Sequence, residues 1–497
     1  MANTSTAIFL TEEERDKIGE WKDGIPADLI TDFDSHAELF TLKCTLRNLA
    51  DWLSKPGAKG TAIKAVEAFL DLAPQLVNLL PDDCLVRSGY NGDDDADVGV
   101  RGLLLNKLMA EKAALPTGIF SDKRCKQHLE LPTSEHQDDV LDNPARWQRV
   151  QDAVAEVQIT ASLSHLVDEI DLSSRDLNES TLMHLARLAH TDKYVDKVMH
   201  SLTCKANERG VIADSMSDGS ISINTSNRDV KRDTKMTQGT KEAVLSSVNA
   251  VLEAIDAVDK GNHANAFVCV RPPGHHVGRD GRTHDASTQG FCHLNNVAIG
   301  VMYALNKLDY QRLTVIDFDV HHGNGTEEIL ASDPKRCQFI SVHAHGSGFY
   351  PQTGGPGDNG RTNVINVPLA WKKGKRVKPA DFDNAWKQVE GEVEKFRPQL
   401  IFLSAGFDAH KHDPTESGKL TDEDFGRLTH KIVDLSCRIE SCHGRVISVL
   451  EGGYHVTVRG GLQSSVKAHL EELLQARQPP ADDQAGAEEE DQGGVLT

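Results

Sequence analysis

The sequence predicts an α/β protein built around a parallel sheet that helices cover on both faces. Short and nearly unbroken apolar runs recur at 266–270, 313–320, 339–343, 400–407 and 445–450. Segments with helical character separate them, as at 241–258 and 381–396. Because parallel strands are buried on both faces and need long crossover connections, this alternation favours a parallel sheet between helical layers.

Three regions of the chain differ in composition. Residues 1–118 carry an apolar stripe with helical spacing, so we predict a mainly helical N-terminal extension. Residues 119–477 hold the alternating pattern, in which the polar stretch 206–233 is expected to be a long loop or insertion. Residues 478–497 are acidic and poor in apolar side chains, which predicts a disordered tail.

The composition indicates an intracellular globular protein. Nine cysteines at scattered spacings favour reduced thiols, no apolar run is long enough to span a bilayer, and the start lacks a secretion signal. The formal net charge of −21 disfavours direct binding of nucleic acid and suits a basic partner such as a lysine-rich protein tail, although it also serves solubility. We therefore expect a nuclear or cytoplasmic protein with neither membrane nor nucleic acid as a partner.

The stretch IDFDVHHGNG (316–325) places ionisable groups at every second position. In an extended strand, Asp317, Asp319 and His321 would share one face. Packed together without a partner, the carboxylates would repel each other and lose hydration. A divalent cation would offset both costs.

Polar side chains follow other predicted strands as well. His275 and His276 follow one strand, Asp408 follows a second, and Gly453 and Tyr454 follow a third. Ligands bind beyond the carboxyl ends of the strands in open parallel sheets, so we expect these groups to meet at one edge. Each has an ordinary explanation as a helix cap or a tight turn, but all of these explanations would have to hold at once.

The chemistry of this assembly fits amide hydrolysis. Asp319, His321 and Asp408 would offer three ligands and leave a position open, as in catalytic rather than structural zinc sites. Because two carboxylates make the cation a milder Lewis acid, the substrate carbonyl needs help, which the Tyr454 hydroxyl could donate. In this scheme one imidazole of the His–His pair helps to activate water and the other protonates the leaving amine.

Six longer motifs occur in the order and near the spacing of one enzyme family. They are RPPGHH (271–276), GFCHLNNVAIG (290–300), DFDVHHGNGT (317–326), GFYPQTGG (348–355), SAGFDAH (404–410) and LEGGYH (450–455). In these motifs the chain resembles the zinc-dependent histone deacetylases, class II most closely. The resemblance covers residues 120–475 and is weaker around Asn143-Pro144-Ala145-Arg146.

This resemblance implies an arginase/deacetylase-type fold, with a central parallel sheet of about eight strands and helices on both faces. It also implies removal of acetyl groups from lysine by one catalytic zinc ion. Carried over by motif, the zinc ligands are Asp319, His321 and Asp408, and the catalytic pair is His275 and His276.

The motifs imply further roles around the pair. Asp317 would orient His275 and help to hold a structural potassium ion, together with Ser341-Val342 and the backbone of two zinc ligands. Asn324 would neighbour His276; class I enzymes have Asp there, so the second histidine should be more acidic in this chain.

A tunnel for the acetyl-lysine stem is implied as well, since its methylenes gain from apolar contact. Phe291 and Tyr350 would form its walls with Gly290 and Gly453 beside them, and Arg146 would line an acetate exit. Many relatives have Phe where this chain has Tyr350. The choice of substrate depends on this departure, on the insertion before residue 240 and on the N-terminal extension. The extension could also serve a multiprotein complex.

We therefore predict a protein lysine deacetylase that acts on acetylated proteins or peptides, with histone tails, and hence chromatin regulation and transcription repression, among the candidates. Some family members carry His at the position of Tyr454 and hydrolyse acetyl-lysine poorly, so Tyr favours catalysis over a scaffold role. Acetylpolyamine hydrolysis and a catalytically weak scaffold are the alternatives. A binuclear manganese hydrolase is disfavoured by the scarcity of further His and Asp ligands near the motifs.

Overall fold

The computed structural model describes residues 115–128, 141–160, 163–203, 211–213, 234, 236–283, 286–356, 361–457 and 460–475. The predicted acidic tail, nearly all of the predicted helical extension and most of the stretch 206–233 lie outside these residues. The first described strand begins at Thr117, two residues before the boundary that the sequence suggests.

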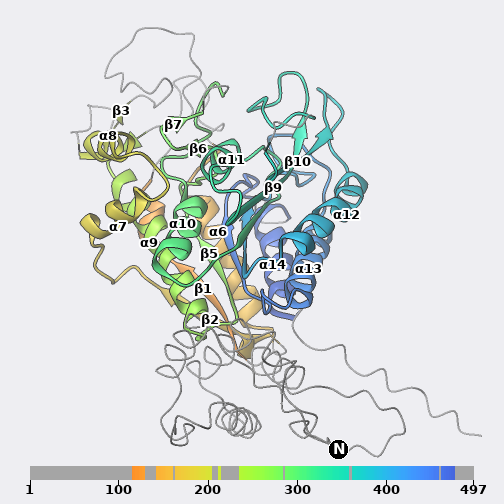
Figure 1. Cartoon of the computed structure of the whole chain (residues 1–497), viewed down its shortest axis with the longest axis horizontal. Coiled ribbons are helices and arrows are strands. Elements are labelled where there is room, and N and C mark those ends of the chain that lie inside the picture. The colour runs from red at the N-terminus through yellow and green to blue at the C-terminus, as the bar shows by residue number, and fades with distance from the viewer. Residues whose placement is uncertain are drawn as a thin grey trace, which may run out of the picture.

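An eight-stranded parallel sheet of order β10-β9-β8-β11-β12-β5-β1-β2 forms the centre (Figure 1). Its strands are β1 (Thr117–Ser121), β2 (Val167–Asp171), β5 (Asn265–Cys269), β8 (Leu313–Asp317), β9 (Cys337–His345), β10 (Val364–Ala370), β11 (Leu400–Ala405) and β12 (Val446–Leu450). The predicted fold class is confirmed. Two small antiparallel pairs accompany the sheet, β3 (Val211–Ala213) with β4 (Met236–Thr237) and β6 (Val277–Gly278) with β7 (Gly281–Arg282).

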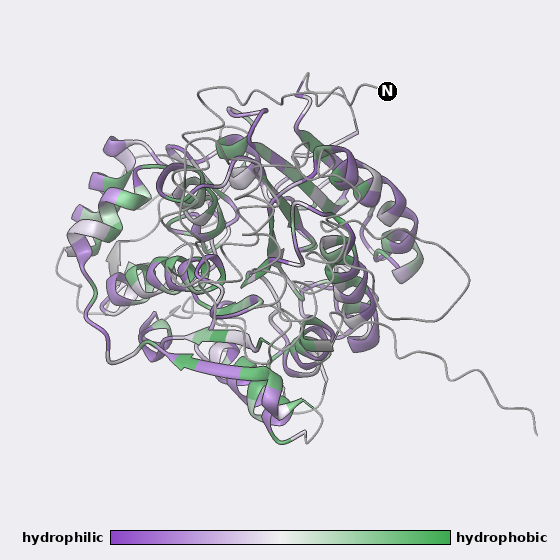
Figure 2. Ribbon diagram, turned by 60° about the horizontal axis from the view of Figure 1, so that its bottom comes forward, coloured by the Kyte–Doolittle hydropathy of each residue, from purple (hydrophilic) through white to green (hydrophobic). Residues whose placement is uncertain are grey.

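Helices cover both faces of this sheet, and Figure 2 shows apolar residues along its inner strands and polar residues on the outer turns of the helices. One apolar cluster joins the sheet to α7 (Glu179–Ala186), α8 (Asp192–Thr203), α9 (Thr240–Asp259), α10 (Asn296–Lys307) and α11 (Asn324–Leu330). The other joins it to α6 (Ala145–Gln158), α12 (Pro379–Phe396), α13 (Asp422–Arg438) and α14 (Leu462–Gln475). Short 3-10 turns lie at η3 (Lys123–Gln127) and η4 (Ser164–Leu166). Within the described residues, no helix has both the length and the apolar character that crossing a membrane requires.

Alternate residues of each central strand enter the two apolar clusters. In β5, Val268 belongs to the first cluster and Phe267 to the second; in β8, Val315 and Ile316 divide in the same way. Since both faces of the sheet are buried, the strands appear in the sequence as unbroken apolar runs rather than as a pattern of period two.

The strand that opens the 316–325 motif is shorter than predicted. The apolar run predicts a strand to residue 320, but β8 ends at Asp317. The expectation that a shared strand face unites Asp317, Asp319 and His321 is therefore wrong. Asp317 Oδ1 accepts the amide of Asp319 (3.1 Å), and Asp319 Oδ1 accepts that of His321 (2.9 Å). A carboxylate that accepts the amide two residues on favours a turn over an extended chain.

Candidate functional site

The loops that carry the candidate residues meet at the carboxyl edge of the sheet. They follow β5, β8, β11 and β12, and these four strands are consecutive neighbours in the order β8-β11-β12-β5. Their carboxyl ends therefore lie side by side, in the position where ligands bind in parallel sheets.

Asp319, His321 and Asp408 come together as predicted. Each offers a ligand atom, and these atoms all lie within 4.8 Å of one another; no other three or more His, Cys, Asp or Glu side chains in the described part of the chain form such a group. His321 Nδ1 lies 3.1 Å from Asp319 Oδ1 and 2.8 Å from Asp408 Oδ2. Both carboxylates are buried, whereas the imidazole keeps 14% of its side-chain surface exposed.

The electrostatics of this trio fit a bound cation. Burial, and then the charge of Asp319, raise the pKa of Asp408 to about 7. Burial opposes the charged form of His321, but Asp408 and Asp319 outweigh it and raise its pKa to about 10. Both shifts express the cost of crowding two carboxylates in a buried place, and a dication would offset that cost.

The backbone keeps a cradle open between the two carboxylates. Gly452 donates its amide to Asp319 Oδ2 (2.8 Å), and Val320 donates to Asp408 Oδ1 (3.0 Å). A Cβ at Gly452 would lie 2.4 Å from Asp319 Oδ2 and 2.6 Å from Asp408 Oδ2. Glycine is therefore required here by the close approach of the carboxylates. Oxygen and nitrogen donors of this set, with one side open, suit zinc.

His275 lies next to the trio and is held by Asp317, as predicted. Its Nδ1 lies 3.0 Å from Asp317 Oδ2, and its Nε2 lies 3.9 Å from Asp319 Oδ2. Burial acts to lower the pKa of His275, but the charges of Asp317 and Asp319 raise it to about 10. A proton is thus favoured on this imidazole.

His276 has the opposite environment. Its Nδ1 donates to Asn324 Oδ1 (2.7 Å), and the Asn324 amide donates in turn to Thr283 Oγ1 (2.6 Å), which fixes the amide orientation. Burial, followed by the neighbouring imidazoles of His275 and His321, holds the pKa of His276 well below its ordinary value. The two imidazole centres are 4.0 Å apart. Titratable neighbours with divergent pKa values are typical of acid–base pairs.

Tyr454 faces the same space. Its amide donates to Asp413 Oδ2 (2.7 Å), and its ring centre lies 5.8 Å from that of Phe291 and 4.7 Å from the Arg146 guanidinium carbon. Burial, which Arg146 opposes and Asp408 reinforces, raises the pKa of Tyr454 well above its ordinary value. The phenol therefore keeps its proton and remains a hydrogen-bond donor.

These groups line a cavity of about 180 Å³. Its walls are Leu141, His276, Gly290, Phe291, His321, Tyr350, Thr415 and Tyr454. Of the predicted tunnel residues, Gly290, Phe291 and Tyr350 are in this set. Gly453 is not; its carbonyl accepts Arg146 Nε (2.6 Å), and its φ of 112° favours glycine.

Ser341 and Val342, which the resemblance assigns to a potassium site, lie in the neighbouring strand β9. Ser341 pairs with Asp317 across β8 and β9, and its Oγ lies 2.9 Å from His343 Nδ1. The pairing of the two strands thus brings Ser341 next to Asp317, and the role of Ser341 and Val342 stays a prediction.

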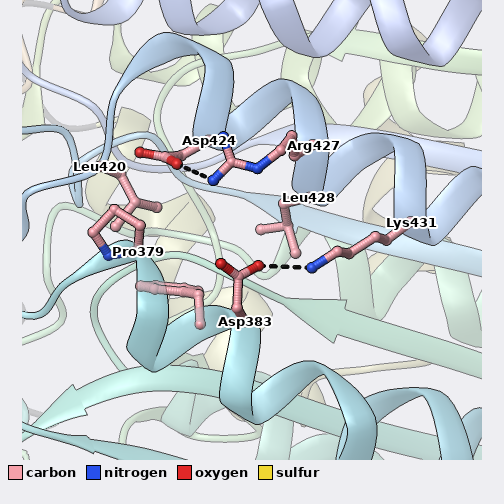
Figure 3. Close-up of a pocket in the computed structure, with 8 residues that line it drawn as sticks. Pro379, Asp383, Leu420, Asp424, Arg427, Leu428 and Lys431 are labelled. Atoms are coloured by element: carbon pink, nitrogen blue, oxygen red, sulfur yellow. Dashed lines mark hydrogen bonds and ion pairs between the residues drawn. The ribbon is translucent and has the colours of Figure 1, made fainter.

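A second, much smaller hollow lies between α12 and α13 (Figure 3). Its volume is about 20 Å³, and it is lined by Pro379, Phe382, Asp383, Leu420, Asp424, Arg427, Leu428 and Lys431. Asp383 pairs with Lys431 at 2.7 Å, and Asp424 pairs with Arg427. Its charged groups are already paired and it contains no residue of the site, so we assign it no role in catalysis.

Sequence reasoning assigned no role to Glu451. Its Oε2 accepts the amides of Gly274 (2.7 Å) and His275 (3.2 Å), and so joins the loop of the histidine pair to the loop of Tyr454. Burial raises the pKa of Glu451 to about 7. The signal was present, since an acidic residue directly after a buried apolar strand calls for a partner.

A buried ion cluster supports the same loops from behind. Asp142 Oδ1 lies 2.6 Å from Arg146 Nη1 and 3.0 Å from Arg271 Nε, and all three side chains are fully buried. Arg146 also donates to the carbonyl of Glu451. Burial acts to raise the pKa of Asp142, but the charges of Arg271 and then Arg146 outweigh it. The net result is a pKa below the ordinary value. The predicted place of Arg146 at an acetate exit stays a prediction.

Removing the charge of Asp142 should cost much stability. In Asp142→Asn, two buried guanidinium groups lose their carboxylate, and we expect the free energy of unfolding to fall by about 3–5 kcal/mol. Urea denaturation followed by circular dichroism measures the change. Asp383→Asn, which removes a half-exposed partner of Lys431, is the control and should cost less than about 1 kcal/mol. Equal effects of the two substitutions would contradict the role assigned to the cluster.

Comparison with known proteins agrees with this geometry. A family model described as the histone deacetylase domain matches residues 141–473. The chain belongs to the histone deacetylase family. The resemblance that the motifs predict is thereby confirmed.

Individual relatives match over part of their length. Type-2 histone deacetylase 2 of Dictyostelium discoideum is 39% identical over 309 residues, which are 59% of this chain and 18% of that protein. Histone deacetylase 10, chloroplastic, of Oryza sativa subsp. japonica is 30% identical over 71% of this chain and 74% of its own. The crystal structure of the HDA15 HD domain superposes with a TM-score of 0.57 at 25% identity, covering 73% of this chain and 91% of its own. The chain spans about a fifth of the length of the Dictyostelium relatives.

Proposed function

We propose that this protein is a zinc-dependent lysine deacetylase that hydrolyses N6-acetyl-lysine in proteins or peptides to lysine and acetate. One observation carries the proposal. The ligand atoms of Asp319, His321 and Asp408 lie within 4.8 Å of one another, and His321 lines the same cavity as His276 and Tyr454. Membership of the histone deacetylase family supports it.

The residues divide the reaction between them. A zinc ion held by Asp319, His321 and Asp408 would polarise the acetyl carbonyl and lower the pKa of a bound water. His276, whose pKa is held low, is suited to accept the proton that the attacking water loses. His275, whose pKa Asp317 raises, is suited to protonate the leaving amine.

Tyr454 stabilises the tetrahedral oxyanion in this scheme. Tyr454 lines the cavity, its raised pKa keeps the hydroxyl protonated, and its ring lies near Phe291 and Arg146. A donor already placed where negative charge develops needs no rearrangement during the reaction, and this is the basis of oxyanion stabilisation.

A structural potassium ion beside Asp317 belongs to the same proposal. Asp317 is fully buried, and it lies opposite Ser341 in the neighbouring strand. A monovalent cation there would offset the buried charge of Asp317. If potassium binds there, the melting temperature of the protein should depend on the potassium concentration at constant ionic strength.

The absence of charge on the Asn324 side chain should set the pH range of the reaction. In Asn324→Asp, a carboxylate would take the place of the amide oxygen 2.7 Å from His276 Nδ1 and raise the pKa of that imidazole. Because His276 must be neutral to accept a proton, we expect the acid limb of the kcat/KM profile to move up by about one pH unit. Asn306→Asp, at an exposed position on α10, is the control. An acid limb that stays in place would remove His276 from the role of base.

The cavity favours a peptide substrate over an acetylpolyamine. None of its eight lining residues carries a carboxylate that could pair with the second ammonium group of a polyamine. The net charge of −21 suits cationic substrates of either kind, including a lysine-rich protein such as a histone tail.

Comparison of an acetyl-lysine peptide with N8-acetylspermidine tests this choice. We expect kcat/KM for the peptide to be at least about tenfold higher, because only the peptide leaves no buried charge unpaired. A preference for acetylspermidine would make the protein an acetylpolyamine amidohydrolase. Binding of the acetyl peptide without release of acetate would support the scaffold alternative.

A further inference from the structure

Tyr350 lines the cavity with its ring and also makes a hydrogen bond with its hydroxyl. It lies in the loop after β9, and its ring centre is 4.8 Å from that of His276 and 6.2 Å from that of His321. The ring therefore borders the cavity at the depth of the candidate metal centre. Its hydroxyl donates to the backbone carbonyl of Thr288, at 3.0 Å.

Thr288 opens the segment 288–291, which forms another wall. Gly290 and Phe291 both have positive φ, of 52° and 67°. A Cβ at Gly290 would lie 2.3 Å from the His276 ring, so the backbone of this wall packs directly against the catalytic pair. A positive φ at a non-glycine residue such as Phe291 persists only where surrounding contacts hold it.

Hydrogen bonds to distant parts of the chain hold this segment, among them the one from Gln289 Nε2 to the Tyr194 hydroxyl oxygen (3.2 Å). The Phe291 amide donates to Thr234 Oγ1 (3.1 Å), and the Thr288 carbonyl accepts from the Tyr350 hydroxyl (3.0 Å). Of these three hydrogen bonds, the one from Tyr350 connects one lining residue with the segment that carries two others. It thus ties two walls of the cavity to each other.

We propose that Tyr350 is a specificity-determining residue, whose hydroxyl fixes the distance between two walls of the cavity and so restricts the acyl group to the size of acetyl. The proposal rests on the proposed deacetylase function and deepens it. A phenylalanine could line the cavity with the same ring, but it could not donate to Thr288. The hydroxyl is therefore the feature by which Tyr350 differs from a phenylalanine at this position.

The direct test is Tyr350→Phe, which keeps the ring and removes only the tie. With the zinc-loaded protein, we expect KM for an acetyl-lysine peptide to rise about fivefold and kcat to stay within about twofold, since the tie acts on binding. The kcat/KM ratio of butyryl-lysine to acetyl-lysine peptide should rise about fivefold, because a looser wall admits the extra methylenes.

The control removes a phenol elsewhere. Tyr303 lies on α10 and donates to Asp256 Oδ1 on α9 (2.7 Å), away from the cavity. Tyr303→Phe should leave KM and the butyryl-to-acetyl ratio unchanged.

A readout without turnover separates this proposal from the proposed function. In a Tyr454→Phe background, calorimetry gives the dissociation constants of the acetyl and butyryl peptides with and without Tyr350→Phe. A ratio of the two constants that shifts toward the butyryl peptide supports the proposal, whether or not the wild-type protein releases acetate. Failure of the wild-type protein to release acetate would count against the deacetylase assignment alone. An unchanged ratio, or a loss confined to kcat, would overturn the proposal.

Discussion

Tyr454→Phe is expected to lower kcat on an acetyl-lysine peptide by about 10²–10³-fold, the cost of removing one oxyanion donor. The hydroxyl is the only group lost. The ring that remains keeps its contacts with Phe291 and Arg146, so the fold and the cavity should be preserved. Because Tyr454 is not among the candidate metal ligands, zinc content should stay at the wild-type value.

Steady-state kinetics and metal analysis of the same preparation measure both quantities. Tyr303→Phe serves as the control for loss of a phenol and should leave kcat unchanged. If Tyr454→Phe retained a kcat within about twofold of the wild type, the hydroxyl would have no part in stabilising the oxyanion.

Asp408→Asn is expected to remove both metal and activity. The amide oxygen of Asn can still accept the Val320 amide that now bonds to Asp408 Oδ1 (3.0 Å), so the loop should keep its shape. The formal charge of the donor set, however, falls from −2 to −1, as only Asp319 remains ionised. We expect zinc affinity to fall by at least about 100-fold and kcat/KM to fall with it.

Equilibrium dialysis against buffered zinc measures the affinity of this variant. Asp434→Asn changes the charge by the same amount at an exposed ion pair with Arg438 and should bind zinc as the wild type does. A variant at Asp408 that binds zinc with unchanged affinity would show that the metal lies elsewhere.

The sequence was sufficient to predict that the three candidate metal ligands and the histidine pair meet at one edge of the sheet. Asp319, Asp408 and His275 each follow a buried apolar run, and parallel strands align such positions at one edge. It also predicted the fold class, since unbroken apolar runs and intervening helices recur over most of the described chain. The sequence could not specify that β8, β11, β12 and β5 are neighbours, because strand order depends on tertiary packing.

Local detail escaped prediction for identifiable reasons. The end of β8 was placed too late because Phe318 and Val320 are apolar and buried, although the carboxylates beside them bind the backbone and turn it. Leu141 and Thr415 line the cavity as single residues outside any of the patterns considered. The tie from Tyr350 to Thr288 joins positions 62 residues apart and becomes visible only in three dimensions.

Zinc titration of the metal-depleted protein tests the central claim most directly, with acetate release from an acetyl-lysine peptide as the readout. The trio of Asp319, His321 and Asp408 predicts no release after chelation and full recovery at one equivalent of zinc per chain. Acetate release at the original rate from protein shown to contain no metal would contradict the account.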